Sequence, residues 1–121
     1  MRHTPEPAIN PTAWAELRAL GGDEADAMVA ELIGMYQEDA AGLVATIRAA
    51  AAAGDAPGLA DATHALRSPS ATLGALPLAE CCRLVELAAR SEGLASAERI
   101  EPLLTEFERV RAALAQLALA P

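Results

Sequence analysis

The sequence is poor in aromatic side chains, contains no lysine and has no long uninterrupted apolar run. Aromatic residues make up 2% of the 121 residues although 53% are hydrophobic, because alanine and leucine supply much of the apolar count. β-Branched residues do not cluster and no useful stretch alternates apolar with polar side chains, so no strand is indicated. Chains rich in alanine and leucine favour helix. We therefore expect an all-α fold.

The charge balance excludes several classes of partner. Nine basic residues, all of them arginine, are outnumbered by 17 acidic residues, and the net charge is −8. Nucleic acids and anionic membrane surfaces bind clustered cations, so we expect neither as a partner. No apolar run reaches the roughly 18 residues of a transmembrane helix. No charged and then apolar leader is present, so we expect a cytoplasmic protein that is not secreted.

The chain contains two cysteines, Cys81 and Cys82, which are adjacent. On a helix, neighbouring cysteines do not easily pair with each other, so we interpret both as small apolar core residues in a reducing compartment. No second cluster of cysteine and histidine accompanies them. We therefore expect no metal site and no cofactor.

The length fits one domain with one core. Residues 1–9, which include His3, show no periodicity and are interpreted as a flexible tail, and residues 10–121 as a single helical domain. Asn10 followed by Pro11 predicts the start of a short helix that ends at Gly21 and Gly22, with its apolar side formed by Trp14, Leu17 and Leu20.

Four longer amphipathic helices are expected after this short one. We place them between Asp23 and Gly54, between Asp55 and Gly74, from Pro77 to about Glu92, and from Ser96 to the end of the chain. In the first of them Val29, Leu32, Tyr36, Ala40, Leu43, Ile47 and Ala50 recur at steps of three and four. Short connections make consecutive helices antiparallel. The expected architecture is an up-down-up-down four-helix bundle with a short extra N-terminal helix.

The second long helix carries the most informative pattern. Its apolar face is formed by Leu59, Ala62, Thr63, Leu66, Ser70 and Leu73. His64 points about 150° away from the middle of that face. Arg67 and Ser68 lie three and four residues further on and are its surface neighbours. Ala60 and Ala71 flank His64 on the helical wheel, so we expect a flat patch of small residues on which a partner docks.

An exposed histidine beside an arginine is able to carry a phosphoryl group. A neutral imidazole nitrogen attacks phosphorus, and a guanidinium engages two phosphate oxygens. The sequence has no Gly-rich nucleotide loop, no paired carboxylates spaced for Mg²⁺ and no Ser/His/Asp arrangement. The phosphoryl group must then come from another protein and return to one. By itself, a histidine on a helix surface is more often an ordinary surface residue.

The chain resembles the histidine-containing phosphotransfer (HPt) domain over essentially its whole length. The resemblance rests on His64-Ala-Leu-Arg-Ser-Pro-Ser-Ala-Thr-Leu-Gly-Ala75, and on Leu78, Cys82, Leu84-Val-Glu86 and Arg90 of the following helix. It implies that His64 accepts a phosphoryl group from a receiver-domain aspartate and passes it to another receiver. It also implies a monomeric carrier in multistep two-component signalling that is not an enzyme, with any Mg²⁺ held by the receiver.

The resemblance also places polar residues of the following helix beside the histidine. Glu86 would orient the imidazole through its second nitrogen, and Arg90 would add a positive group. Ser68 or Ser70 would donate a hydroxyl hydrogen bond, although Ser70 is expected to face inward. The alternative for Glu86 and Arg90 is an exposed i,i+4 ion pair with no role in the chemistry.

Two residues depart from the family pattern, Ser68 in place of glycine and Pro69 in place of serine. Proline has no N–H for the helix and disfavours helical geometry in the residue before it. One hypothesis is a helix that kinks one turn after His64 and stays functional. The other is a degenerate site on a bundle that binds a receiver or another regulator without being phosphorylated. A hydrolase or a metal enzyme ranks third, because no second catalytic group is present.

Overall fold

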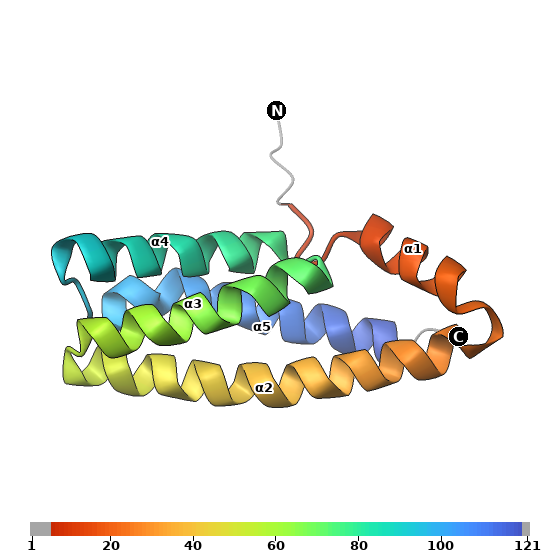
Figure 1. Ribbon diagram of the computed structural model, residues 1–121, viewed down its shortest axis with the longest axis horizontal. Helices are drawn as coiled ribbons and strands as arrows, with labels where there is room; N and C mark the ends of the chain where they lie inside the picture. The colour runs from red at the N-terminus through yellow and green to blue at the C-terminus, as the bar shows by residue number, and fades with distance from the viewer. Residues whose placement is uncertain (1–5, 120–121) are drawn as a thin grey trace.

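The computed structural model describes residues 6–119, which fold into five α-helices and one 3₁₀ turn. They are α1 (Pro11–Gly21), η1 (Gly22–Glu24), α2 (Ala25–Ala53), α3 (Ala56–Leu73), α4 (Leu76–Glu92) and α5 (Ala97–Leu119). Helices α2 to α5 lie side by side along the long axis, and α1 leans against one end of α2 (Figure 1). The described residues contain no strand, so the expected all-α bundle with an extra N-terminal helix is confirmed.

Local signals fix most helix ends where the sequence places them. The side chain of Asn10 accepts a hydrogen bond from the Thr12 N–H at 3.0 Å and begins α1. Asp55 does the same for the Gly58 N–H at 3.0 Å and begins α3. Gly74 ends α3 with φ +91°, a left-handed conformation that costs glycine little because it has no Cβ. These caps satisfy backbone groups that a helix end leaves without partners.

The start of α2 differs from the expectation. The helix begins at Ala25 with Glu24 as its N-cap, which forms no side-chain capping bond. The Asp23 backbone belongs instead to the 3₁₀ turn η1. Gly22 has φ +57° and ends α1, so the chain makes this turn before the longer helix can start. The expected N-cap is therefore one residue too early.

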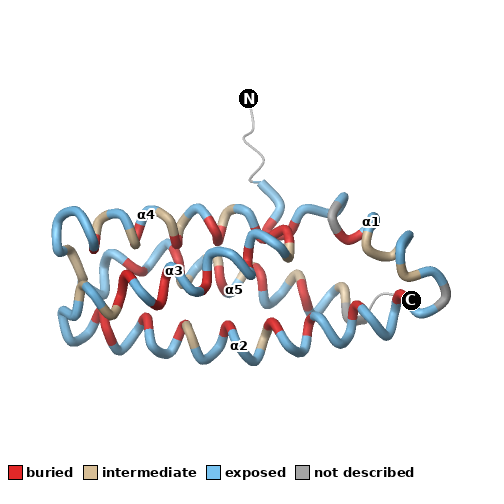
Figure 2. The backbone as a smooth tube through the Cα atoms, viewed as in Figure 1, coloured by how far each residue is buried: buried red, intermediate tan, exposed pale blue. Residues whose placement is uncertain are grey.

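The core is built mainly from leucine, isoleucine, valine and alanine side chains of α2 to α5, and α1 contributes Trp14. Figure 2 shows these buried positions on the inner sides of α2 to α5. In α2 the buried face includes Ile33 and Val44, whereas Leu32 is 41% exposed and Leu43 is half-buried. In so long a helix, spacings of three and four fit the row that contains Leu32 and Leu43 as well as the adjacent row that contains Ile33 and Val44. Packing against the other helices determines which row is buried. Leu20 is 86% exposed, because the end of α1 extends beyond the bundle (Figure 1).

Residues 6–9 pack on the bundle, which the expectation of a flexible tail missed. Ala8 and Ile9 are buried in the core. The Asn10 N–H donates to the Gly74 carbonyl at 2.8 Å, and Arg109 Nη2 donates to the Glu6 carbonyl at 2.6 Å. These two hydrogen bonds fix the segment on the bundle, and burial of the apolar Ile9 side chain stabilises it there. Residues 1–5, including His3, lie outside the described residues.

Helix α3 continues through Pro69 to Leu73 without a break. One residue after the proline, Ser70 is fully buried and its hydroxyl lies 2.8 Å from the hydroxyl of Tyr36 on α2. Burial raises the pKa of Tyr36, and the Ser70 bond partly offsets this. The bond ties α2 to α3 inside the core, and it holds the second half of α3 in place despite the missing backbone donor of Pro69.

Replacing Pro69 with alanine is expected to stabilise the protein by about 2 kcal/mol. A proline inside a helix costs about 3 kcal/mol relative to alanine, and about 1 kcal/mol of that is offset because proline restricts the unfolded chain. Urea denaturation measures the difference, with Ser68→Ala in the same exposed turn as the control. A lower midpoint for Pro69→Ala would show that the proline ring contributes packing that outweighs the lost hydrogen bond.

Among the described residues, no helix combines the length and the hydropathy needed to cross a lipid bilayer.

Candidate functional site

His64 stands on the exposed side of α3, as the helical wheel predicts. Its side chain is 68% exposed. The opposite face of the same turns is fully buried at Leu59, Thr63 and Leu66. Thr63 satisfies its own hydroxyl within the helix, donating to the carbonyls of Leu59 and Ala60. The imidazole is therefore held in solvent by a helix whose other face is anchored in the core.

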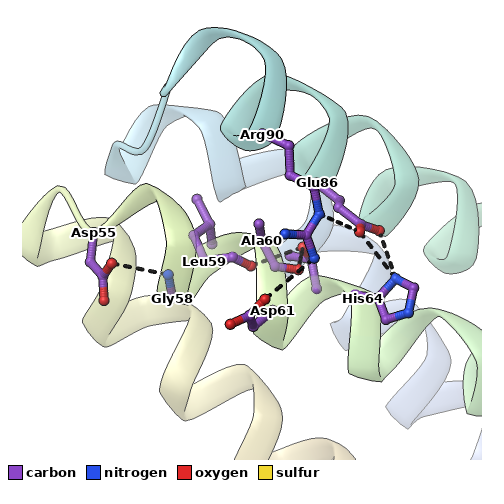
Figure 3. A network of polar contacts seen from close by, with 9 residues as sticks. Asp55, Gly58, Leu59, Ala60, Asp61, His64, Glu86 and Arg90 are labelled. Carbon is purple, nitrogen blue, oxygen red and sulfur yellow. Dashed lines mark hydrogen bonds and ion pairs between the residues drawn. The ribbon is translucent and has the colours of Figure 1, made fainter.

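Glu86 of α4 contacts the imidazole directly. Nδ1 of His64 lies 3.0 Å from Oε2 and 3.2 Å from Oε1 of Glu86 (Figure 3). An ionised carboxylate only accepts hydrogen bonds, so Nδ1 carries the proton and donates it. The lone pair then resides on Nε2, which Figure 3 shows turned away from Glu86. The pair fixes both the tautomer of the ring and the direction of its free nitrogen.

Arg90 and Asp61 extend this contact into a chain of charges. Arg90 Nε donates to Glu86 Oε2 at 2.8 Å, and Arg90 Nη2 donates to Asp61 Oδ1 on α3 at 3.3 Å. Burial opposes ionisation of Glu86, but the hydrogen bonds from Arg90 and His64 outweigh it and lower its pKa. The carboxylate is therefore charged at neutral pH. The i,i+4 pair of Glu86 and Arg90 exists, and it is joined to the histidine.

Arg67 is exposed on α3, one turn after His64. It borders a surface hollow together with Glu80 and Cys81 of α4 and Glu106 of α5. It forms no ion pair with another described residue. The structure thus assembles His64, Glu86 and Arg90 through direct bonds, and it leaves Arg67 as a neighbouring guanidinium without a fixed partner among the described carboxylates.

The other expected residues of the site divide into exposed and buried ones. Ser68, Pro69 and Ala71 are exposed. Ser70 is fully buried against Tyr36, so its hydroxyl does not reach a group bound on the surface.

Ala60 corrects the expected docking patch, because it is 1% exposed. Helix α4 packs on this side of α3, as the contact between His64 and Glu86 shows, and it covers Ala60. The wheel gives the angle of a residue about its own axis but does not say which neighbouring helix lies beside it. Of the two expected alanines, Ala71 is the one that contributes to the surface.

Sequence reasoning did not assign Asp61 to the site. An acidic residue three positions before the histidine was the available signal, since i and i+3 are surface neighbours on a helix. Its bond to Arg90 was not predictable from that spacing, because Arg90 comes from another helix.

The cysteines behave as core residues. Cys82 is fully buried, and burial raises its pKa to about 12. Cys81 is half-buried, and burial together with the charges of Glu106 and Glu80 raises its pKa. Both thiols therefore stay protonated at neutral pH and are poor nucleophiles. No group of three or more potential metal-binding side chains occurs in the part of the chain that the structure describes.

Comparisons with known proteins bear on the family and on the fold. The family model of the Hpt domain matches residues 31–119. No curated protein matches the chain. Among solved structures, the crystal structure of histidine-containing phosphotransfer protein B (HptB) from Pseudomonas aeruginosa PAO1 is similar with a TM-score of 0.59 and 23% identity. The similarity covers 95% of this chain and 91% of that one, and it shows a shared fold.

Proposed function

The chain belongs to the Hpt domain family, and from this premise we propose that it carries a phosphoryl group in a phosphorelay on Nε2 of His64. The observation that supports the assignment most directly is the bond between Nδ1 of His64 and Glu86. It leaves one nitrogen of an exposed imidazole with a free lone pair facing solvent. A nucleophilic nitrogen on a ring that a second residue orients, here Nε2 of His64 with Glu86 at Nδ1, is the arrangement that group transfer needs.

The transfer is a displacement at phosphorus. The Nε2 lone pair forms the P–N bond while the P–O bond of a receiver's aspartyl phosphate breaks, and the carboxylate of that aspartate departs with the electron pair. The imidazole becomes positively charged as the bond forms, and the carboxylate of Glu86 at Nδ1 balances this charge. Onward transfer reverses these events toward another receiver.

The partner in this proposal is a receiver domain of a response regulator or a hybrid kinase. Phosphoryl transfer passes through a loose transition state that mainly requires alignment and neutralisation of charge. His64 supplies the nucleophile, and Arg67 supplies a guanidinium one turn away. The receiver supplies the aspartate and the Mg²⁺ bound beside it. The protein therefore acts as a carrier and not as an autonomous enzyme.

The proposal is tested by transfer of label. A panel of receiver domains is phosphorylated with ³²P-acetyl phosphate, freed of the donor and mixed with the purified chain in the presence of Mg²⁺. We expect label to move to the chain and to be acid-labile and base-stable, as a phosphoramidate is. Tight binding of a receiver without transfer would contradict the carrier function and favour the alternative of a non-phosphorylated adaptor.

Arg67→Ala is expected to slow transfer about 5- to 10-fold, because a charge-assisted bond to phosphate contributes about 1 kcal/mol or more where it is partly exposed. The fold is expected to be unchanged, since Arg67 is exposed and has no ion-pair partner among the described residues. Single-turnover transfer measures the rate and circular dichroism the fold. Arg48→Ala on α2, also an exposed arginine, is the control for loss of one positive charge. Equal rates for the two variants would remove Arg67 from the site.

A further inference from the structure

The charged side chains that are linked to His64 through Glu86 are unbalanced. Two carboxylates, Asp61 and Glu86, share the single guanidinium of Arg90. At neutral pH this cluster keeps one net negative charge on the Nδ1 side of the His64 ring. A phosphoryl group on His64 adds further negative charge at the same place. This cluster therefore opposes the negative charge of the group that His64 is proposed to carry, whereas Arg67, one turn away on α3, favours it.

Arg90 does not remove this opposition, because its guanidinium is held at both ends. Its Nε binds Glu86 on its own helix, and its Nη2 binds Asp61 across the interface with α3. Figure 3 shows the guanidinium on the side of Glu86 away from His64. The guanidinium is paired with two carboxylates and faces away from Nε2.

Asp61 is responsible both for the excess negative charge of the cluster and for holding the guanidinium of Arg90 away from Nε2. It precedes His64 by three positions on α3, which places the two side chains next to each other, with Cβ atoms about 5–6 Å apart. Its carboxylate is 77% exposed, so its presence is not required by the core. It has one bond to another described side chain, and that bond is to Arg90.

We propose that Asp61 weakens the hold of His64 on its phosphoryl group, so that the partition between His64 and a receiver is shifted toward the receiver. This rests on the proposed function, and it concerns how the group divides between the two proteins. Asp61 acts in two ways, and both destabilise the phosphorylated form of His64. Its charge repels the phosphoryl dianion, and its bond to Arg90 keeps that guanidinium from turning toward Nε2.

The effect is modest because the groups are exposed. Charges one helical turn apart at the surface interact weakly, and salt screens them further. We expect Asp61→Asn to raise the ratio of phosphorylated His64 to phosphorylated receiver about two- to fivefold at partition equilibrium. Asp61→Lys, which reverses the charge, is expected to raise the ratio further than Asp61→Asn does.

The experiment partitions ³²P between the chain and the receiver that labels it fastest in the panel described above. Label on His64, label on the receiver and free phosphate are quantified separately until the ratio of the first two is constant. Glu92→Gln is the matched control, because Glu92 is an exposed residue of α4 whose replacement changes the net charge equally. The ratio for this control is expected to equal that of the wild type.

A further pair of variants separates the two ways in which Asp61 acts. In an Arg90→Gln background, Asp61→Asn should raise the ratio less than in the wild-type background, because there is no guanidinium left to release. An equal rise in both backgrounds would overturn the role given to Arg90.

The outcomes distinguish this inference from the function on which it rests. If the wild type takes no label from any receiver, the carrier function fails and this inference fails with it. If the wild type is labelled but Asp61→Asn leaves the ratio unchanged, or Glu92→Gln raises it equally, the carrier function stands and the role of Asp61 is refuted.

Discussion

His64→Gln is expected to reduce transfer of label from a phosphorylated receiver by about a thousandfold or more, to the background of the assay. Glutamine has a similar reach and can still bond Glu86, but its amide nitrogen has no lone pair that attacks phosphorus. The side chain of His64 is 68% exposed, so the substitution is expected to leave the fold intact. The measurement is single-turnover transfer, with acid lability of the label recorded for wild type and variant.

His3→Gln is the matched control, because His3 is the second of the two histidines in the chain. We expect it to transfer at the wild-type rate. Label that survives in His64→Gln and disappears in His3→Gln would show that His3 carries the phosphoryl group, and it would contradict the assignment to His64. Unfolding of His64→Gln, seen by circular dichroism, would show instead that the imidazole has a structural role that its exposure does not suggest.

Glu86→Ala is expected to slow transfer about 10- to 100-fold. The Nδ1 bond to Glu86 is a hydrogen bond to a charged group, and such bonds contribute about 1.5–3 kcal/mol, which corresponds to about that range in rate. Without it the ring rotates and the proton is shared between the two nitrogens, so a smaller fraction of molecules presents an Nε2 lone pair. Onward transfer is also expected to slow. In the wild type Glu86 holds the proton on Nδ1, so the ring leaves phosphorus as neutral imidazole, and Glu86→Ala removes this hold.

Glu86→Gln separates position from charge. The amide oxygen still accepts from Nδ1 at the same place, but it does not balance the positive ring, so we expect a rate between those of the wild type and Glu86→Ala. The tautomer of His64, measured by ¹⁵N NMR on the unphosphorylated protein, should be mainly Nδ1–H in the wild type and mixed in Glu86→Ala. A wild-type rate for Glu86→Ala would reduce its pair with Arg90 to an ordinary surface ion pair.

The bond between His64 and Glu86 shows how far sequence reasoning carries. The expectation that Glu86 meets the imidazole came from resemblance to a family, and the residues themselves left an i,i+4 pair with Arg90 as an equal alternative. In the structure both contacts exist, and one carboxylate makes them. Nothing in the spacing of residues on one helix fixes the distance to a side chain 22 positions away.

The sequence by itself determined the helices, most of their ends and the exposure of His64. These properties are local: Asn10 and Asp55 cap the turns that follow them, Gly74 ends α3, and the period of the apolar residues turns the histidine away from the core. Only the tertiary structure decided that Ala60 is covered and that Arg90 reaches Asp61. A helical wheel fixes angles about one axis, whereas these contacts depend on which helix packs alongside and at what height along it.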